Sequence, residues 1–197
     1  MHKYDLPDLY HIARSDFHTK PWKNGKGTTH DILMLPDGCD HTSFDLRFAL
    51  SPIIEAGVFS TFPGADRVIT LVEGQGLDLR FETHCEHLMP LQCLHFDTGL
   101  APIGTPSQGG VAVINVMAKR DIWQIAACHV VPTLHMECGD NDLVFVYALQ
   151  QDCSLNIDGT RTWVDQANAV LLSGPSMIDI EGLFLYAHLT PGKPKLL

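Results

Sequence analysis

Isolated cationic and amide residues lie on or beside the apolar segments of this chain. Arg47 lies within FDLRFALS, Arg67 follows TFPGAD, and Asn115 interrupts VAVINVM, a run that ends in Lys119 and Arg120. A buried Asn must find hydrogen-bond partners, and arginine binds a carboxylate through two parallel hydrogen bonds. The pattern therefore allows two interpretations: a shared pocket for an anion or amide, or solvated arginines with Asn115 bonded to nearby backbone.

The stretch PWKNGKGTTHDI, residues 21–32, is the second candidate. Asn24-Gly25 suits a hairpin turn, and Trp22 could anchor such a loop in the core. Alternatively, Trp22, Lys23 and Asn24 offer a ligand an aromatic wall, a cation and an amide within three residues. Spacing alone slightly favours the structural interpretation.

The sequence gives less support to a metal site or a catalytic nucleophile. His84, Cys85 and His87, followed by Cys93 and His95, supply enough donors for a zinc or iron site. On one strand, however, His84 and His87 would face opposite sides, and the chain contains no H-x-H pair. We interpret these as solvated residues of a polar hairpin linker, ETHCEHLMPLQ, and expect no metal and no cofactor. The sequence also lacks a G-x-S-x-G elbow and a phosphate-binding loop, which argues against a hydrolase or kinase.

The elements that must position these residues are strands. In FDLRFALS the apolar Phe44, Leu46, Phe48 and Leu50 share one parity, which places Arg47 on the opposite face. No segment shows a sustained helical period, so we predict an all-β sandwich or barrel. Further predicted strands are short β-branched and aromatic runs bounded by turn residues: VITLVEG (68–74), LDLRF (77–81), VAVINVMA (111–118), LVFVYAL (143–149), NAVLLSG (168–174) and LFLYAHL (183–189).

A weak internal repeat suggests two similar halves. VITLVEG, LDLRF, LHFDTG and VAVINVMA are followed by LVFVYAL, CSLNIDG, AVLLSG and LFLYAHL in a similar layout. We therefore expect a larger first half, residues 1–120, and a smaller second half, residues 121–197, packed together as one unit. In the first half, Pro63-Gly64 suits the centre of a type II turn that leads to Arg67.

Composition limits the partners. The formal net charge is -10 and the apolar fraction is 45%, which is typical of a globular protein whose acidic surface repels nucleic acid and anionic membranes. The polar start and the absence of a long apolar run predict a soluble cytoplasmic protein, in which six scattered cysteines are free thiols. A homodimer is compatible with a small barrel, although no segment marks an interface.

Several of these motifs, in order, resemble the HutD/Ves family. PWKNGKGTTHDI, then FSTFPGADRVITLVEG, then INVMAKR are similar to the family's P-W-K-N-G-G-G-T-T opening, its FS-F-PG-DR turn with a TLLEG-like strand, and its D-F-N-V-M-x-R strand. The likeness covers residues 21–120. Beyond them only the general layout of the strands is similar. Lys26 stands where the family has glycine, and Val113 stands where it has an acidic residue, so no carboxylate acts there.

The resemblance implies a cupin-like double-stranded β-helix, or jelly-roll barrel, in two halves. It also implies an association with histidine utilisation and the binding of a pathway metabolite, such as urocanate or formiminoglutamate, without established catalysis. Arginines and a lysine would suit a carboxylate, and the aromatic residues would suit a planar body. The family residues that carry over to a ligand site are Trp22, Lys23, Asn24, Arg47, Phe59, Ser60, Arg67, Asn115, Met117 and Arg120.

Our leading hypothesis is therefore a non-enzymatic protein that binds a small carboxylate or imidazole metabolite. The first alternative is a cupin-type enzyme, either a metal-dependent oxygenase or isomerase or a metal-free enzyme whose acid or base is Glu73, Asp66 or a histidine. The second alternative is a regulatory module that binds another protein through an exposed strand edge and needs no ligand.

Overall fold

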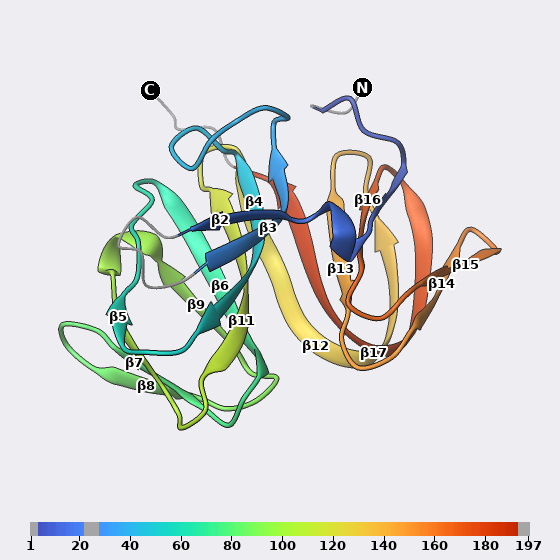
Figure 1. The fold of residues 1–197 in the computed structure, drawn as a ribbon. Helices are drawn as coiled ribbons and strands as arrows, with labels where there is room; N and C mark the ends of the chain where they lie inside the picture. Colours follow the sequence, from blue (N-terminus) through green and yellow to red (C-terminus); the bar gives the residue numbers. More distant parts are fainter. Residues whose placement is uncertain (1–3, 22–27, 193–197) are drawn as a thin grey trace. The chain divides into compact units, whose positions relative to one another are not determined.

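The computed structural model describes residues 4–21 and 28–192 (Figure 1). Its described residues fall into two compact units, one comprising residues 18–21 and 28–122 and the other residues 4–17 and 123–192; we call these the N-terminal and C-terminal units. Residues 4–17 thus group with the C-terminal half of the chain, whereas the division expected from the sequence placed them in the first half. Helical structure in the described residues is limited to two short 3-10 helices, η1 (Arg14–Asp16) and η2 (Thr98–Leu100). No described helix has the length and apolarity needed to cross a bilayer.

The N-terminal unit contains two antiparallel sheets. Six strands form one sheet in the order β2-β3-β4-β11-β6-β9, and four form the other in the order β5-β10-β7-β8. The strands are β2 (His18–Pro21), β3 (Thr28–Leu35), β4 (Leu46–Ile53), β5 (Gly57–Val58), β6 (Ala65–Glu73), β7 (Leu77–Arg80), β8 (Cys85–Leu88), β9 (Cys93–Asp97), β10 (Ile103–Pro106) and β11 (Val111–Lys119).

The C-terminal unit contains one seven-stranded sheet in the order β1-β16-β13-β17-β14-β15, with β12 paired to β17. Strand β1 joins this sheet through antiparallel pairing with β16, which explains why the start of the chain belongs here. The strands are β1 (Leu9–Ile12), β12 (Trp123–Cys138), β13 (Leu143–Ala148), β14 (Cys153–Ile157), β15 (Thr160–Val164), β16 (Ala169–Ser173) and β17 (Ser176–Pro191).

The period-2 runs form strands as predicted, but two segments differ. The stretch ETHCEHLMPLQ, expected as a polar linker, contains β8; this expectation is wrong because cross-strand pairing with β7 stabilises an exposed strand, with His87 Nδ1 2.6 Å from Asp78 Oδ1. Strand β17 begins at Ser176, well before the predicted start at Leu183. Gly182 hid the continuity, yet a glycine is needed there because a Cβ would lie 2.7 Å from Cys153 Sγ.

The two units have different interiors. The C-terminal unit encloses an apolar cluster that includes Val144, Val146, Val170, Leu172 and Phe184. Among the described residues, the buried charged side chains all belong to the N-terminal unit, which also contributes most of the buried polar ones: Thr29, Asp31, Arg47, Ser51, Arg67, Thr70, Thr98 and Asn115. Because polar groups are costly to bury without a partner, the N-terminal unit is where we look for a site.

Candidate functional site

The floor of the site is a grid of side chains on β4, β11 and β6. Met117 lies opposite Arg47 of β4 on one side and opposite Arg67 of β6 on the other, so these three residues form one cross-strand row. Asn115 lies two residues further along β11 and therefore faces the same side of the sheet. The alternation predicted for FDLRFALS is thus confirmed for Arg47, and it extends across three neighbouring strands.

A cavity of about 440 Å³ opens above this grid, and the described residues that line it run from Lys20 to Lys119. The walls combine aromatic rings, aliphatic side chains and polar groups, as small-molecule sites commonly do. Its lining includes Lys20, Pro21, Thr29, His41, Phe44, Arg47, Ser51, Ile53, Glu55, Phe59, Ser60, Phe62, Arg67, Val113, Asn115, Met117 and Lys119.

Arg47 is already paired. Its Nε and Nη2 donate to Asp31 Oδ1 at 2.8 and 2.7 Å, and only 2% of Asp31 is exposed. The other carboxylate oxygen of Asp31 lies 2.9 Å from His41 Nε2 and 4.0 Å from Lys20 Nζ. Asp31 balances the charge of Arg47. This arginine therefore adds little net positive charge to the cavity, although its N–H groups remain fixed in position there.

Arg67 has a different environment. Its side chain is buried, with 3% of the residue exposed, and no carboxylate among the described residues forms an ion pair with it. Its Nη2 donates to the Ser60 carbonyl at 3.1 Å, but Nε has no hydrogen-bond partner among the described residues. Burial, with a smaller contribution from the positive charge of Arg47, lowers the pKa of Arg67 to about 9.

Three aromatic rings surround the Arg67 guanidinium. Its Cζ lies 5.3 Å from the ring centre of Phe59, 5.7 Å from Phe62 and 5.6 Å from Phe96. Such contacts stabilise a cation by about 0.5–1 kcal/mol each, or more when it is desolvated, but they satisfy no N–H group. The ring of Phe59 is seated over Gly104, where a Cβ would lie 2.4 Å from Phe59 Cε2.

Asn115 is held by a short chain of hydroxyl groups. Its Nδ2 donates to Ser51 Oγ at 3.5 Å, and Ser51 Oγ lies 3.3 Å from Thr29 Oγ1. The Asn115 Oδ1 atom has no hydrogen-bond partner among the described residues, although only 5% of the residue is exposed. The described lining of the cavity therefore includes an unsatisfied buried donor, Arg67 Nε, and an unsatisfied buried acceptor, Asn115 Oδ1.

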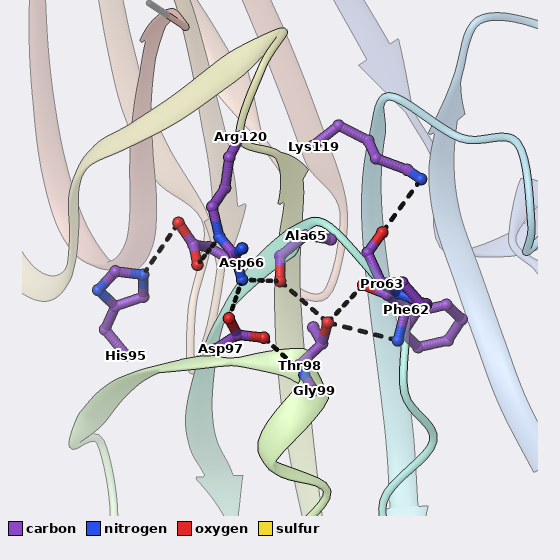
Figure 2. Close-up of polar contacts among 10 residues, drawn as sticks. All are labelled: Phe62, Pro63, Ala65, Asp66, His95, Asp97, Thr98, Gly99, Lys119 and Arg120. Atoms are coloured by element: carbon purple, nitrogen blue, oxygen red, sulfur yellow. Dashed lines mark hydrogen bonds and ion pairs between the residues drawn. The ribbon is translucent and has the colours of Figure 1, made fainter. Parts of the chain in front are cut away.

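The aromatic wall rests on a turn that Thr98 fixes. The turn closes through a hydrogen bond from the Ala65 N–H to the Phe62 carbonyl at 3.0 Å, and Gly64 has a φ of 78°, which confirms the turn predicted at Pro63-Gly64. Figure 2 shows the Thr98 hydroxyl between the two ends of this turn. Its Oγ1 accepts from the Phe62 N–H at 3.3 Å and donates to the carbonyl of Phe62 or Ala65, at 2.5 and 2.9 Å.

Arg120 braces the same turn and is not among the residues that line the cavity. Its Nε donates to Asp66 Oδ1 at 2.7 Å, and its Nη2 donates to the Ala65 carbonyl at 3.2 Å and to the Asp97 carboxylate (Figure 2). The hydrogen bond to Asp66 is the main cause of the raised pKa of Arg120. The family resemblance assigned Arg120 to a ligand. In the structure its guanidinium instead pairs with two carboxylates of the protein, those of Asp66 and Asp97.

The structure brings six of the ten sequence-predicted residues to one cavity: Arg47, Phe59, Ser60, Arg67, Asn115 and Met117. Trp22, Lys23 and Asn24 lie outside the described residues. Sequence reasoning missed Asp31, His41, Phe62 and Thr98. The signal for Asp31 was present, because a lone carboxylate interrupts the apolar strand TTHDILML as Asn115 interrupts its own.

The histidines that suggested a metal are dispersed. His84 pairs with Glu86 at 3.7 Å, His87 with Asp78 at 2.6 Å, and His95 with Asp66 at 3.8 Å. Among the residues that the structure describes, no three His, Cys, Asp or Glu side chains converge on a position that could hold a metal ion. All six cysteines are free, as predicted.

Two antiparallel β-units in one chain, one of them enclosing a polar cavity, define a two-barrel cupin-like protein. A Bacillus subtilis oxalate decarboxylase with Mn(II) centres shares this fold, with a TM-score of 0.59, 6% identity, and 93% and 77% of the two chains covered. HutD from Pseudomonas fluorescens SBW25 is more similar: its TM-score is 0.80 at 22% identity, and 94% of this chain and 100% of that chain are covered.

The HutD family model matches residues 14–183, and the chain belongs to the HutD family. Protein Ves of Citrobacter koseri is 33% identical over 102 residues, which are 51% of this chain and 52% of Ves. An uncharacterized 21.2 kDa protein in the hutC 3′ region of Pseudomonas putida is 37% identical over 75 residues, which are 38% of each chain. The matched stretches therefore span about half or less of the length of these curated relatives.

The donor groups in this cavity do not fit a metal ion of the kind named for the oxalate decarboxylase. The described lining offers one imidazole, His41, and one carboxylate, Glu55, and the imidazole already contacts Asp31. The floor also presents the uncompensated cation of Arg67, which repels a divalent cation and attracts an anion. The chemistry of the lining therefore favours anion recognition.

Proposed function

We propose that this protein binds a small carboxylate metabolite in the cavity of its N-terminal unit without transforming it. The observation that carries the proposal is Arg67, a buried cation that faces the cavity, lacks a carboxylate partner among the described residues and keeps an unused Nε donor. A bound carboxylate would supply both the missing charge and the missing acceptor, and arginine recognises carboxylates in this way.

The ligand is a metabolite of histidine degradation, urocanate or formiminoglutamate, and its occupancy modulates that pathway. Membership of the HutD family supports this assignment, as does the similarity to the protein from the hutC 3′ region of P. putida. The cavity has room for such a body, and Phe59 and Met117 provide apolar walls on which a planar or aliphatic chain can pack.

The test is isothermal titration calorimetry together with thermal unfolding of the protein in urocanate, formiminoglutamate, histidine or glutamate. A ligand that binds only the folded state stabilises it by RT ln(1 + [L]/Kd), about 2.7 kcal/mol at a hundredfold excess over Kd. We expect stabilisation by a pathway carboxylate and its loss in Arg67→Met. Unchanged unfolding with every carboxylate would refute the proposal.

A second candidate is a metal-free acid–base enzyme, which the His41–Asp31 contact favours. A carboxylate that orients a histidine beside a ligand cavity is a common arrangement for general base catalysis, and His41 Nε2 lies 2.9 Å from Asp31 Oδ2. Prolonged incubation of each bound metabolite, followed by chromatography, distinguishes the two functions. Turnover that disappears in His41→Gln would favour the enzyme; quantitative recovery of the metabolite supports a binding protein.

A further inference from the structure

A second unsatisfied atom in the cavity constrains the ligand further. Asn115 Oδ1 is a buried carbonyl oxygen with capacity for two hydrogen bonds, and it receives none from the described residues. Buried polar atoms in folded proteins are rarely left in this state unless a ligand or ordered water completes them. Asn115 and Arg67 line the same cavity. A ligand there would therefore need an acceptor for Arg67 and a hydrogen-bond donor for Asn115.

Each of the neighbouring donor groups contacts a partner other than Asn115 Oδ1. The Asn115 amide nitrogen and the Ser51 and Thr29 hydroxyls contact one another in a chain, with separations of 3.5 and 3.3 Å. Lys119 Nζ donates to the Pro63 carbonyl at 3.4 Å, and Arg67 Nη2 donates to the Ser60 carbonyl at 3.1 Å. A ligand that fills the cavity without offering a hydrogen-bond donor leaves Asn115 Oδ1 unsatisfied and therefore binds more weakly.

The sheet fixes the spacing of the two strand positions that carry Arg67 and Asn115. Met117 pairs directly with Arg67, so Asn115, two residues along β11, is the diagonal neighbour of Arg67. Diagonal neighbours on one face of an antiparallel pair are about 7–8 Å apart. Met117, which pairs with Arg67 and shares a strand face with Asn115, adds an apolar side chain beside both, and this suits a short hydrocarbon or planar spacer.

We propose that the ligand carries, in addition to its carboxylate, an N–H or O–H group that donates a hydrogen bond to Asn115 Oδ1. This inference rests on the proposed carboxylate-binding function and narrows it. The substrate class is a carboxylate joined through a short spacer to a heteroaromatic N–H, amide, amidine or hydroxyl group. Simple hydrocarbon acids, which offer no donor, bind more weakly.

A matched pair of ligands tests this inference without changing the protein. The compounds are 3-(pyrrol-2-yl)propenoate and 3-(furan-2-yl)propenoate, which share shape and carboxylate but differ in a ring N–H against a ring oxygen. We expect calorimetry to show the pyrrole acid binding at least about tenfold more tightly, since the furan acid leaves Asn115 Oδ1 unsatisfied. In Asn115→Leu this preference should fall below about twofold, and Ser51→Ala, which keeps Oδ1, should retain it.

The outcomes separate this inference from the proposed function. Equal affinity of the two acids for the wild-type protein overturns the assignment of Asn115 and leaves carboxylate binding intact. Cooperative unfolding shows that the wild-type protein is folded. If the folded wild-type protein binds neither acid, both the inference and the proposed function are contradicted. Because the wild-type comparison needs no variant, it stands even if Asn115→Leu does not fold.

Discussion

Replacement of Arg67 by methionine should stabilise the ligand-free protein while removing its ability to bind. The lowering of the Arg67 pKa to about 9 corresponds, at about 1.36 kcal/mol per unit, to roughly 5 kcal/mol of unfavourable free energy for the buried cation. Methionine removes this unfavourable free energy and keeps an apolar side chain packed against the aromatic rings around residue 67. The variant loses the contacts of the cation with those rings and its hydrogen bond to the Ser60 carbonyl, which offset part of the gain.

The expected net change is an increase of roughly 1–3 kcal/mol in the free energy of unfolding, which resembles the gain seen when buried charges are replaced by apolar residues. For a chain of this size, that corresponds to a rise in Tm of about 2–12 °C. Urea unfolding at pH 7.5, with and without a saturating carboxylate, measures both effects. The ligand-induced stabilisation present in the wild-type protein should be absent in Arg67→Met.

Arg80→Met is the matched control, because Arg80 is exposed on β7 of the same unit. Surface substitutions of this kind usually change stability by less than about 0.5 kcal/mol. If Arg67→Met instead lowered the free energy of unfolding by more than about 1 kcal/mol, and Arg80→Met did not, Arg67 would already be compensated within the fold. The reasoning that assigns it to a ligand would then be wrong.

Three further predictions concern the same wall and its charge. Thr98→Val should weaken carboxylate binding about tenfold by freeing the Phe62 turn, whereas Thr98→Ser, which keeps the hydroxyl, should bind normally in calorimetry; equal losses in both would contradict this role. Gly104→Ala should displace the Phe59 ring, since its Cβ would lie 2.4 Å from that ring, and should weaken binding more than it changes Tm. Binding should be constant from about pH 6 to pH 8 and should fall through about pH 9 as Arg67 loses its proton, in step with its pKa. The unfavourable contribution of charged Arg67 to stability is fully present below the folded-state pKa of about 9 and is relieved as the pH rises above it toward the higher pKa of the unfolded chain, so the stability difference between wild type and Arg67→Met should shrink there.

The sequence predicted the strands that alternate cleanly and the residues they present. The parity of FDLRFALS placed Arg47 correctly, and the lone Asn115 in an apolar run marked a polar interior. Long strands without such a pattern were missed: β12 carries Pro132, and pairs with β17 through two register shifts. Its local sequence therefore resembles a series of short irregular pieces, and only tertiary pairing makes it one strand.

The partners of the charged residues could not be predicted, because they are distant in sequence. Arg120 meets Asp66 and Asp97 only when β11, β6 and β9 are aligned in one sheet, so the family motif alone assigned it to a ligand. Arg47 meets Asp31 across two adjacent strands in the same way. The distinction between a compensated arginine and an uncompensated one is therefore a property of the register.

The contrast between the two interiors explains why one unit can carry a ligand site. The C-terminal unit fills its core with aliphatic side chains such as Val146 and Leu172, which contribute stability at about 25 cal/mol per Å² of buried apolar surface. The N-terminal unit gives up part of that gain by burying Arg67 and Asn115 with atoms unsatisfied. A ligand that supplies both an anion and a donor returns the lost free energy on binding. The N-terminal unit of the empty protein should therefore be the less stable unit, and hydrogen exchange should show its β6 and β11 amides gaining protection when a carboxylate binds, while β13 and β16 remain unchanged.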